Sequence, residues 1–232
     1  MKHWQEIYNR KRITIEEALT HIKSEDVIVS ALCATEPQGI LGKLHTIADR
    51  VKKVDVYMCL PLKDYPFFAE PAMEGSFNLI SWFHTATIRK INLSGRNISY
   101  QPNHLYLAIS DLLSWRKINV FLGSCTPPDH TGHVSLSCSL PFEKEALENA
   151  QIVILEVNEN LPRTHGDTHV RVDRVNYFYE RKAPVPTLCT PDPNEKDFLI
   201  GNHCADLIEN GSTLQVGIGG IPNACTDRKS VV

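Results

Sequence analysis

The 232-residue sequence has no long hydrophobic run and no excess of basic residues. No apolar stretch approaches the roughly 20 residues that a membrane-spanning helix needs. The formal net charge is -3, and no block of lysine and arginine stands out, so nothing in the charge pattern favours a nucleic-acid partner. The sequence therefore indicates neither a membrane protein nor a nucleic-acid-binding protein.

Paired cysteines are also missing. The seven cysteines are widely spaced, their number is odd, and none form a C-x-x-C pair, which argues against a disulfide framework or a zinc ribbon. The N-terminal residues lack the apolar core of a signal peptide and include an early acidic residue, Glu6. We therefore expect a reduced, cytoplasmic setting.

What the sequence does contain is an alternation of strand-like and helical segments. Apolar runs predict strands at 26–32, 54–60, 118–123, 134–138 and 151–157. Helical spacing predicts helices at 14–22, 40–51, 141–150 and 194–210. This alternation predicts an α/β fold, an open and mostly parallel sheet with flanking helices.

The ends of two predicted helices are marked by capping residues. Thr14 and Glu17 have the spacing of a capping box, and Gly211 is expected to cap the last helix. The expected apolar stripe of that last helix is Phe198, Ile200, Ala205, Leu207 and Ile208.

A proline-rich segment at 182–193 predicts a stiff linker. We expect an N-terminal α/β domain at 1–181, and at 194–232 a helix, a strand and a glycine loop that begin the next subdomain. Ligands of parallel sheets bind outside the carboxyl ends of the strands. Three loops rich in histidine, aspartate or glycine each follow a predicted strand, so we expect them to meet at one edge of the sheet. These loops are 124–133, 158–169 and 217–220.

Two of these loops, 124–133 and 158–169, are rich in histidine and aspartate. Imidazole and carboxylate groups suit zinc or iron, and the alternative is that these are polar turn residues with Asp129 and Asp167 bonded to local amides. Neither loop places its histidines in a recognised helical metal-binding motif such as H-E-x-x-H, and we predict no metal. The candidate ligands are His130, His133, His165, Asp167 and His169.

Two single residues each have two interpretations. Cys125 is next to a turn and is a candidate nucleophile, or it is a small buried hydrophobic residue like most free cysteines. Glu36 is a candidate pocket carboxylate, or it begins a helix whose dipole favours negative charge.

The third loop, within Thr213-Leu-Gln-Val-Gly-Ile-Gly-Gly-Ile-Pro222, reads as a strand, a tight turn and a helix N-terminus. Glycines permit close backbone approach to a ligand, and helix N-termini attract phosphate. Taken alone the loop is also consistent with a plain turn, because it matches neither the phosphate-loop nor the dinucleotide pattern. The stretch after Pro222 is too short and irregular to predict much of a helix.

Taken together, these loops resemble the acetyl-CoA hydrolase/transferase family, particularly its 4-hydroxybutyrate and butyrate:acetate CoA-transferases. The resemblance extends to about Ala224 and is strongest over 208–222. The motifs that carry it are Trp4-Gln-Glu-Ile-Tyr8, Thr35-Glu-Pro37, Pro127-Pro-Asp-His-Thr-Gly132, Glu156-Val-Asn158 with Pro162, and His165-Gly-Asp167.

The resemblance implies covalent catalysis, in which a glutamate attacks the acyl-CoA thioester and a carboxylate completes the exchange. It implies coenzyme A as a substrate, with no covalently bound cofactor, and a glycine loop that forms part of the CoA site. Carried onto this sequence, the loop is Gly217, Ile218, Gly219, Gly220 and Ile221.

The family's catalytic glutamate has no counterpart in this sequence, and neither Glu156 nor Glu209 takes its position. We expect a truncated N-terminal part of a two-domain CoA-transferase that is inactive alone. Its expected partners are acyl-CoA and a small carboxylate, with homo-oligomerisation or pairing with an intact protomer as further options. The alternative is a non-catalytic partner or remnant.

Overall fold

The computed structural model describes residues 3–93, 97–187 and 192–230. The chain divides into two compact units, Met1–Pro186 and Thr187–Val232, and each is described by itself below. The boundary between the units falls within the proline-rich segment at 182–193.

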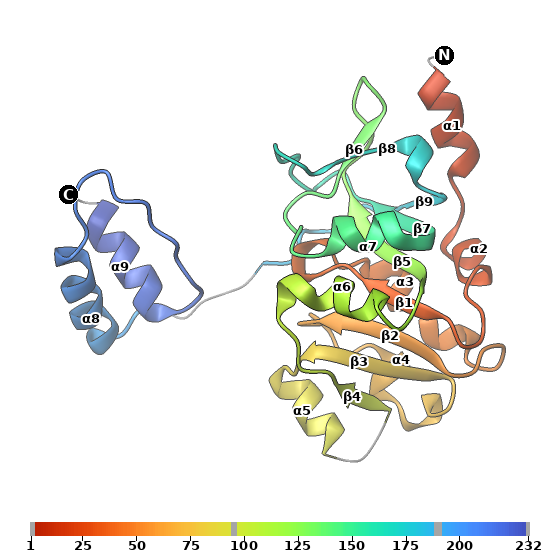
Figure 1. The fold of residues 1–232 in the computed structure, drawn as a ribbon, viewed down its shortest axis with the longest axis horizontal. Coiled ribbons are helices and arrows are strands. Elements are labelled where there is room, and N and C mark those ends of the chain that lie inside the picture. The colour runs from red at the N-terminus through yellow and green to blue at the C-terminus, as the bar shows by residue number, and fades with distance from the viewer. Residues whose placement is uncertain (1–2, 94–96, 188–191, 231–232) are drawn as a thin grey trace. The chain divides into compact units, whose positions relative to one another are not determined.

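The first unit is built on a seven-stranded sheet in the order β4-β3-β2-β1-β5-β7-β9, and every neighbouring pair is parallel (Figure 1). This arrangement confirms the predicted α/β fold. The strands are β1 (Val27–Ser30), β2 (Val54–Cys59), β3 (Phe77–Phe83), β4 (Ile98–Tyr100), β5 (Ile118–Cys125), β7 (Ala150–Val157) and β9 (Tyr177–Glu180). A second, antiparallel sheet pairs β6 (His133–Ser135) with β8 (His169–Arg171).

Short helices surround the sheet. They are α1 (His3–Lys11), α2 (Ile15–Thr20), α3 (Gln38–Leu41), α4 (Pro66–Ala69), α5 (Ala86–Asn92), α6 (Ala108–Leu113) and α7 (Glu143–Asn149). Single 3₁₀ turns lie at η1 (Cys33–Thr35), η2 (Leu44–Ile47), η3 (Pro71–Met73), η4 (Leu105–Leu107) and η5 (Val172–Arg174). The predicted capping box forms at the start of α2, where Thr14 and Glu17 bond reciprocally.

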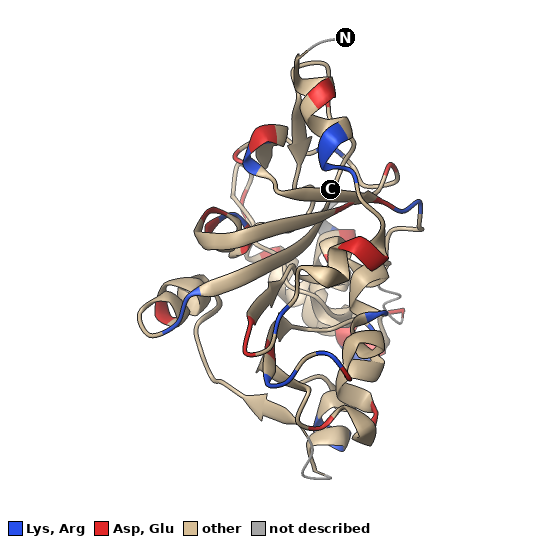
Figure 2. Ribbon diagram, turned by 90° about the vertical axis from the view of Figure 1, so that its right-hand side faces the viewer, with Lys and Arg blue, Asp and Glu red and all other residues tan. Residues whose placement is uncertain are grey.

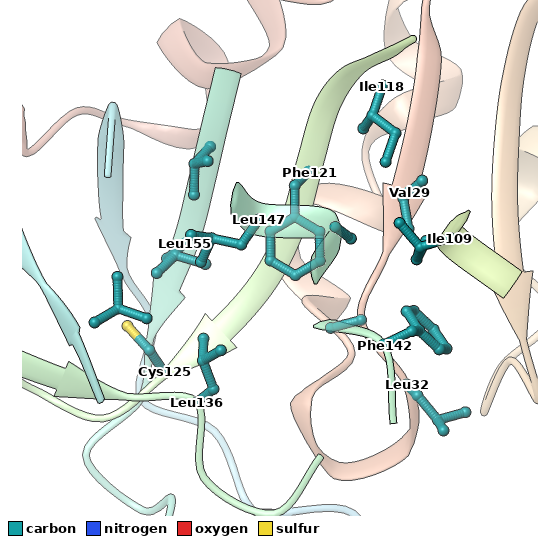
Figure 3. Packing of buried hydrophobic residues seen from close by; sticks show 14 of the residues in the cluster. Val29, Leu32, Ile109, Ile118, Phe121, Cys125, Leu136, Phe142, Leu147 and Leu155 are labelled. Atoms are coloured by element: carbon teal, nitrogen blue, oxygen red, sulfur yellow. The ribbon is translucent and has the colours of Figure 1, made fainter. Parts of the chain in front are cut away.

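Each face of the sheet has its own core because successive side chains of a strand point to opposite faces. On one face Val29 and Phe121 pack with α6 and α7, and Figure 3 shows Leu147 and Leu155 beside the Phe121 ring. On the other face Ile28 packs with α2, α3 and α4. Buried on both faces, the strands read in the sequence as continuous apolar runs.

Two predictions for the first unit need correction, and two of its strands were not predicted. The helix predicted at 40–51 is two short turns, α3 and η2, because the chain ends its first turn at Gly42, although Ile40, Leu44 and Val51 are buried as a helix would require. The strand predicted at 134–138 ends at Ser135, since Ser137 has a φ of 61° and turns the chain. Strands β3 and β4 lie in the stretch 61–101, which the sequence pattern left unassigned.

The second unit consists of α8 (Glu195–Asp206) and α9 (Gly220–Ser230) packed together. Gly201 of α8 allows the two helices to approach each other closely. A Cβ at Gly201 would lie only 2.9 Å from the carbonyl carbon of Ala224 in α9, and Ala224 is fully buried. Asn194 caps α8 in a capping box with Asp197.

The predictions for the helices of the second unit also need correction. Helix α8 ends at Asp206 rather than 210, and Gly211, with a φ of 83°, lies in the turn beyond rather than at its cap. The expected stripe is not buried, since Ile200 and Leu207 are exposed. Residues after Pro222 form most of the 11-residue α9, contrary to expectation, because α8 packs against them and supplies what their irregular sequence lacks.

The strand predicted at the start of the glycine loop is also wrong for this structure. Residues 212–217 carry no strand assignment, and within the described part of the second unit there is no other strand to pair with them. A strand requires a partner for its backbone groups, so an isolated β-prone segment stays unpaired.

Charged residues of both signs are interspersed along the ribbon (Figure 2). No helix within the described residues is long and apolar enough to cross a membrane.

Candidate functional site

The strand order places a topological switch point between β1 and β5. From β1 the chain proceeds through β2, β3 and β4 on one side, and through β5, β7 and β9 on the other. Because parallel sheets bind ligands in the crevice at such a point, the candidate site lies at the carboxyl ends of these strands. The loops that follow β1, β5 and β7 all begin at this edge.

A buried glutamate from α7 holds the loop that follows β1. Glu143 accepts hydrogen bonds from the amide of Leu32 at 3.0 Å and from the hydroxyl of Ser139 at 2.6 Å. Cys33, which follows Leu32, has a φ of 52°, in the left-handed region that is unfavourable for residues with a side chain. The loop is therefore held in a specific, strained conformation at the switch point.

Glu36 lies in the same loop and is only 3% exposed. Its carboxylate accepts hydrogen bonds from the Tyr65 hydroxyl and from the Leu62 amide, the latter at 3.2 Å. Burial raises the pKa of Glu36 to about 7, although the hydrogen bonds from Tyr65 and Leu62 favour the charged form. The carboxylate is thus poised to titrate near neutral pH and joins the loops after β1 and β2.

Glu36 has two interpretations from its sequence, a residue that begins a helix and a pocket carboxylate, and the structure bears on each separately. In the chain it does precede helix α3, as the second interpretation expects. Its carboxylate, however, lies in the protein interior against Tyr65, and a role in a ligand pocket stays a prediction.

The carboxylate that caps α3 belongs instead to Glu156, near the end of β7. Glu156 is 2% exposed and accepts hydrogen bonds from the Gly39 amide at 2.9 Å, the Tyr179 hydroxyl at 2.8 Å and the Arg181 guanidinium at 3.2 Å. Burial, with the nearby Glu156 charge and hydrogen bond, raises the pKa of Tyr179 well above its ordinary value. The network joins β7, β9 and the start of α3.

Sequence reasoning did not find the partners of Glu143 and Glu156. A signal for Glu156 was present: a glutamate within the strongly apolar run 151–157 has to be compensated once that strand is buried. The partners Gly39 and Arg181 lie 117 and 25 residues away, so no local pattern identifies them.

The two histidine-rich loops meet at this edge; the third loop of that expectation belongs to the second unit, so for it the expectation stays a prediction. Their strands β6 and β8 pair antiparallel, with His133 opposite Arg171. Arg163 of the second loop donates to the first, to Thr126 Oγ1 at 2.9 Å and to the Pro127 carbonyl at 2.7 Å, and pairs with Asp129 at 3.3 Å. These contacts fix one loop against the other.

The aspartates of these loops are bound by protein groups. Asp129 accepts hydrogen bonds from the amides of Thr131 and His133; burial alone would raise its pKa, but these bonds and Arg163 hold the pKa below its ordinary value. Asp167 pairs with Lys144 rather than with a local amide. His130, His165 and His169 are exposed.

No group of three potential ligands among the described residues is placed to hold a metal ion. The geometry of these loops therefore supports the interpretation as polar turns, at Asp129 above all.

Cys125, at the end of β5, is fully buried in the core. Burial raises the pKa of its thiol strongly. Since the thiolate is the reactive form, this environment favours the interpretation of Cys125 as a small hydrophobic residue (Figure 3).

The predicted CoA loop, 217–221, belongs to the second unit. Gly217 and Ile218 are exposed, Gly219 has a φ of 144°, and α9 begins at Gly220. A Cβ at Gly220 would lie 2.5 Å from Asp197 Oδ2, so a carboxylate already lies beside the N-terminus of α9. The role of the loop in binding CoA stays a prediction.

Two pockets of the first unit lie at opposite edges of its sheet. One of about 310 Å³ lies at the carboxyl edge, between Tyr8 of α1, Pro127 and Arg181. A larger one, about 590 Å³, lies at the opposite edge beside Asp55 and Arg116. We place the candidate site at the carboxyl edge despite its smaller pocket, because the switch point and the buried carboxylates are there.

Comparison with known proteins identifies relatives over nearly the whole chain. Residues 1–188 match the Acetyl-CoA hydrolase/transferase N-terminal domain. The 4-hydroxybutyrate coenzyme A transferase of Clostridium kluyveri is 32% identical over 223 residues, which are 95% of this chain and 51% of that protein. The butyryl-CoA:acetate CoA-transferase of Anaerostipes caccae is 26% identical over 230 residues, 95% of this chain and 50% of that protein.

Solved structures agree with these relatives. RipA from Yersinia pestis superposes with a TM-score of 0.91 at 25% identity, covering 97% of this chain and 55% of RipA. The 4-hydroxybutyrate CoA-transferase from Porphyromonas gingivalis shares the fold, with a TM-score of 0.77 at 22% identity over 98% of this chain and 53% of that protein. The family resemblance seen in the motifs is confirmed, and the chain spans about half the length of the relatives it matches.

Proposed function

Because the chain belongs to the acetyl-CoA hydrolase/transferase family, we propose that it contributes to CoA exchange between a short-chain acyl-CoA and a carboxylate. The match over residues 1–188 carries this proposal. The similar 4-hydroxybutyrate and butyryl-CoA:acetate transferases favour acetate, butyrate or 4-hydroxybutyrate as the acid.

We propose that residues 217–221 contact CoA through exposed backbone amides. Gly219 supports this because its φ of 144° is strained for any side chain, as expected where a backbone approaches a ligand closely. The Asp197 carboxylate beside Gly220 offsets the positive end of α9. The loop backbone, rather than the helix dipole, is therefore the proposed contact.

Residues 1–232 by themselves are proposed to bind CoA without turning it over. In the family pattern the attacking glutamate follows the Ile221-Pro222 motif in a later strand, and no residue of this sequence takes its position. The buried carboxylates Glu36 and Glu156 are proposed to position the loops of the site, since their partners are protein groups.

Two measurements on the purified chain test the proposal. Butyryl-CoA is incubated with acetate and the purified chain, and chromatography is expected to show no acetyl-CoA. Steady formation of acetyl-CoA would overturn the proposal that residues 1–232 bind CoA without turning it over. Calorimetry is expected to show heat on addition of CoA, and no heat at millimolar CoA would overturn the binding role.

A pair of glycine variants makes the binding test specific. Gly219→Ala is expected to weaken CoA binding about tenfold or more, the effect of losing roughly 1.4 kcal/mol. Gly211→Ala is the matched control, because Gly211 also has a positive φ and lies in the second unit but outside the loop. Equal effects of the two variants would remove the loop from the CoA site.

A second candidate function is a non-catalytic partner that pairs with an intact protomer. The exposed apolar side chains of Leu207, Leu214 and Ile218 favour it, because pairing with a partner would remove them from water. Light scattering on purified chain tests it: self-association supports this candidate, and a monodisperse monomer at high concentration counts against it.

A further inference from the structure

The strands β6 and β8, which lie side by side (Figure 1), bring two histidines of the histidine-rich loops to one face. In the antiparallel pairing His133 lies opposite Arg171. His169, two residues earlier on β8, lies opposite Ser135. Since alternate residues of a strand point to the same face, both imidazoles project from the same side of the pair. Their ring centres are 6.5 Å apart, with the ring planes inclined at 70°.

The hydrogen bonds around Thr131 fix the tautomer of His133. The Thr131 hydroxyl oxygen lies 2.6 Å from Asp129 Oδ1 and 2.8 Å from His133 Nδ1. A carboxylate only accepts hydrogen bonds, so the single hydroxyl hydrogen of Thr131 goes to Asp129. The Thr131 oxygen must then accept from His133, which places a hydrogen on Nδ1. In the neutral ring this leaves the lone pair of Nε2 free to bind a ligand.

We infer that His133 and His169 form a two-histidine site for a divalent transition-metal ion such as Ni²⁺ or Zn²⁺. Imidazole suits both ions. A histidine that binds a metal is normally held by a hydrogen bond from its other ring nitrogen, as His133 is by Thr131. Among the described residues no third protein ligand joins the pair, so water completes the coordination. The site is an exception to the expectation of no metal in these loops.

The spacing of the two rings fits one bound ion. With metal–nitrogen bonds of about 2.1 Å, two imidazoles on one ion have ring centres about 5 to 6.4 Å apart. His169 is exposed, so its ring can make the small turn that this requires. A bound ion would join β6 to β8 and thereby hold the two loops together.

The arginines beside the pair have carboxylate partners. Arg163 donates to the His133 carbonyl at 3.1 Å and pairs with Asp129 at 3.3 Å. Arg171, opposite His133, pairs with Asp173 at 2.6 Å. Each guanidinium charge is thus offset locally, which reduces its repulsion of a cation. The site is independent of the proposed CoA chemistry.

The test is calorimetry of the untagged chain with Ni²⁺ and, separately, with Zn²⁺. Iodoacetamide first blocks the exposed thiols of Cys138 and Cys204, which would otherwise compete for metal. His133→Ala and His169→Ala are each expected to weaken binding about tenfold or more. His165→Ala removes an exposed histidine of the same loop as His169 and should leave the affinity unchanged.

Thr131→Val tests the positioning role of the hydroxyl. Thr131 is exposed, so the variant should fold, and metal binding is expected to weaken about tenfold. Nitrogen NMR of the metal-free chain is expected to show His133 with its hydrogen on Nδ1. In Thr131→Val the Nε2–H form should gain population, which a merely structural role of Thr131 would not produce.

Hydrogen exchange of the unsubstituted chain supplies a measurement that needs no variant. Added metal is expected to slow exchange at the amides of 133–135 and 169–171, because the ion joins the two strands. Three outcomes would overturn the inference: unchanged exchange at these amides at saturating metal, equal affinity in the unsubstituted chain and both alanine variants, or a metal-free His133 with its hydrogen on Nε2.

Discussion

The Glu156 carboxylate and the Gly39 amide are joined by a 2.9 Å hydrogen bond across 117 residues of sequence. A Cβ at Gly39 would lie 2.7 Å from the same carboxylate oxygen, so only glycine permits this approach. The contact ties the start of α3 to the end of β7 at the candidate site.

Gly39→Ala is therefore expected to destabilise the first unit by about 1–3 kcal/mol, because the added methyl group displaces the Glu156 carboxylate. Urea unfolding measures the change. In a Glu156→Ala background the further cost of Gly39→Ala should fall, since the nearest clashing atom has gone. Strictly additive costs would contradict this account.

Replacing the carboxylate separates its charge from its shape. Glu156→Ala is expected to cost about 2–4 kcal/mol, because the buried Tyr179 hydroxyl and the Gly39 amide lose their acceptor. Glu156→Gln keeps one acceptor oxygen and is expected to cost about half as much. Equal costs for both variants, measured by urea unfolding, would show that the charge itself dominates.

Glu36 is expected to make stability fall as pH rises. Its folded-state pKa of about 7 lies above the ordinary value of 4.5, so its contribution is fully present below about pH 4.5 and is lost as pH rises through about 7. The loss is at most about 3 kcal/mol. Unfolding free energies measured at pH 5.5, 7 and 8.5 follow it.

Glu36→Gln should flatten this dependence and be more stable than the unsubstituted chain at pH 8.5. The neutral amide accepts from Leu62 and donates to Tyr65, whose hydroxyl can reverse its role. Glu70→Gln, at an exposed glutamate of the same unit, is the control. An unchanged difference in stability between pH 5.5 and 8.5 in Glu36→Gln would show that Glu36 is not the group responsible.

Gly201→Ala is expected to loosen the pairing of α8 and α9. Alanine normally stabilises a helix interior relative to glycine by about 1 kcal/mol, but here its Cβ would lie 2.9 Å from the Ala224 carbonyl carbon and 3.0 Å from the Cys225 amide nitrogen. We expect faster hydrogen exchange throughout both helices. Gly217→Ala, which adds a methyl group in open space in the same unit, should leave exchange unchanged; increased protection in Gly201→Ala would contradict the packing described.

The cysteines are expected to react in the order of their exposure. In the native chain iodoacetamide should label the exposed Cys138 and Cys204 first. Cys59, whose pKa is raised to about 11 by burial, and Cys125 should be labelled only after denaturation. Mass spectrometry of the peptides measures this, and rapid native labelling of Cys125 would restore it as a candidate nucleophile.

Local sequence patterns predicted much of the fold. The capping box at Thr14 and the apolar strands around Ile28, Phe121 and Ile154 depend on neighbours within a few residues, so their signals are complete in the sequence. The helix α9 could not be predicted in the same way, because its stability comes from α8 packing at Ala224 rather than from its own residues.

The sequence by itself therefore determined the α/β class, the family and the loops that begin at the carboxyl edge of the sheet. Only the tertiary structure decided which carboxylates serve that edge: Glu156 caps α3, and Glu36 is buried against Tyr65. It also decided that residues 213–218 stay unpaired within the described chain. The physical reason is the same in each case, since a buried charge and a strand are both completed by partners distant in sequence, and local patterns do not encode which partners those are.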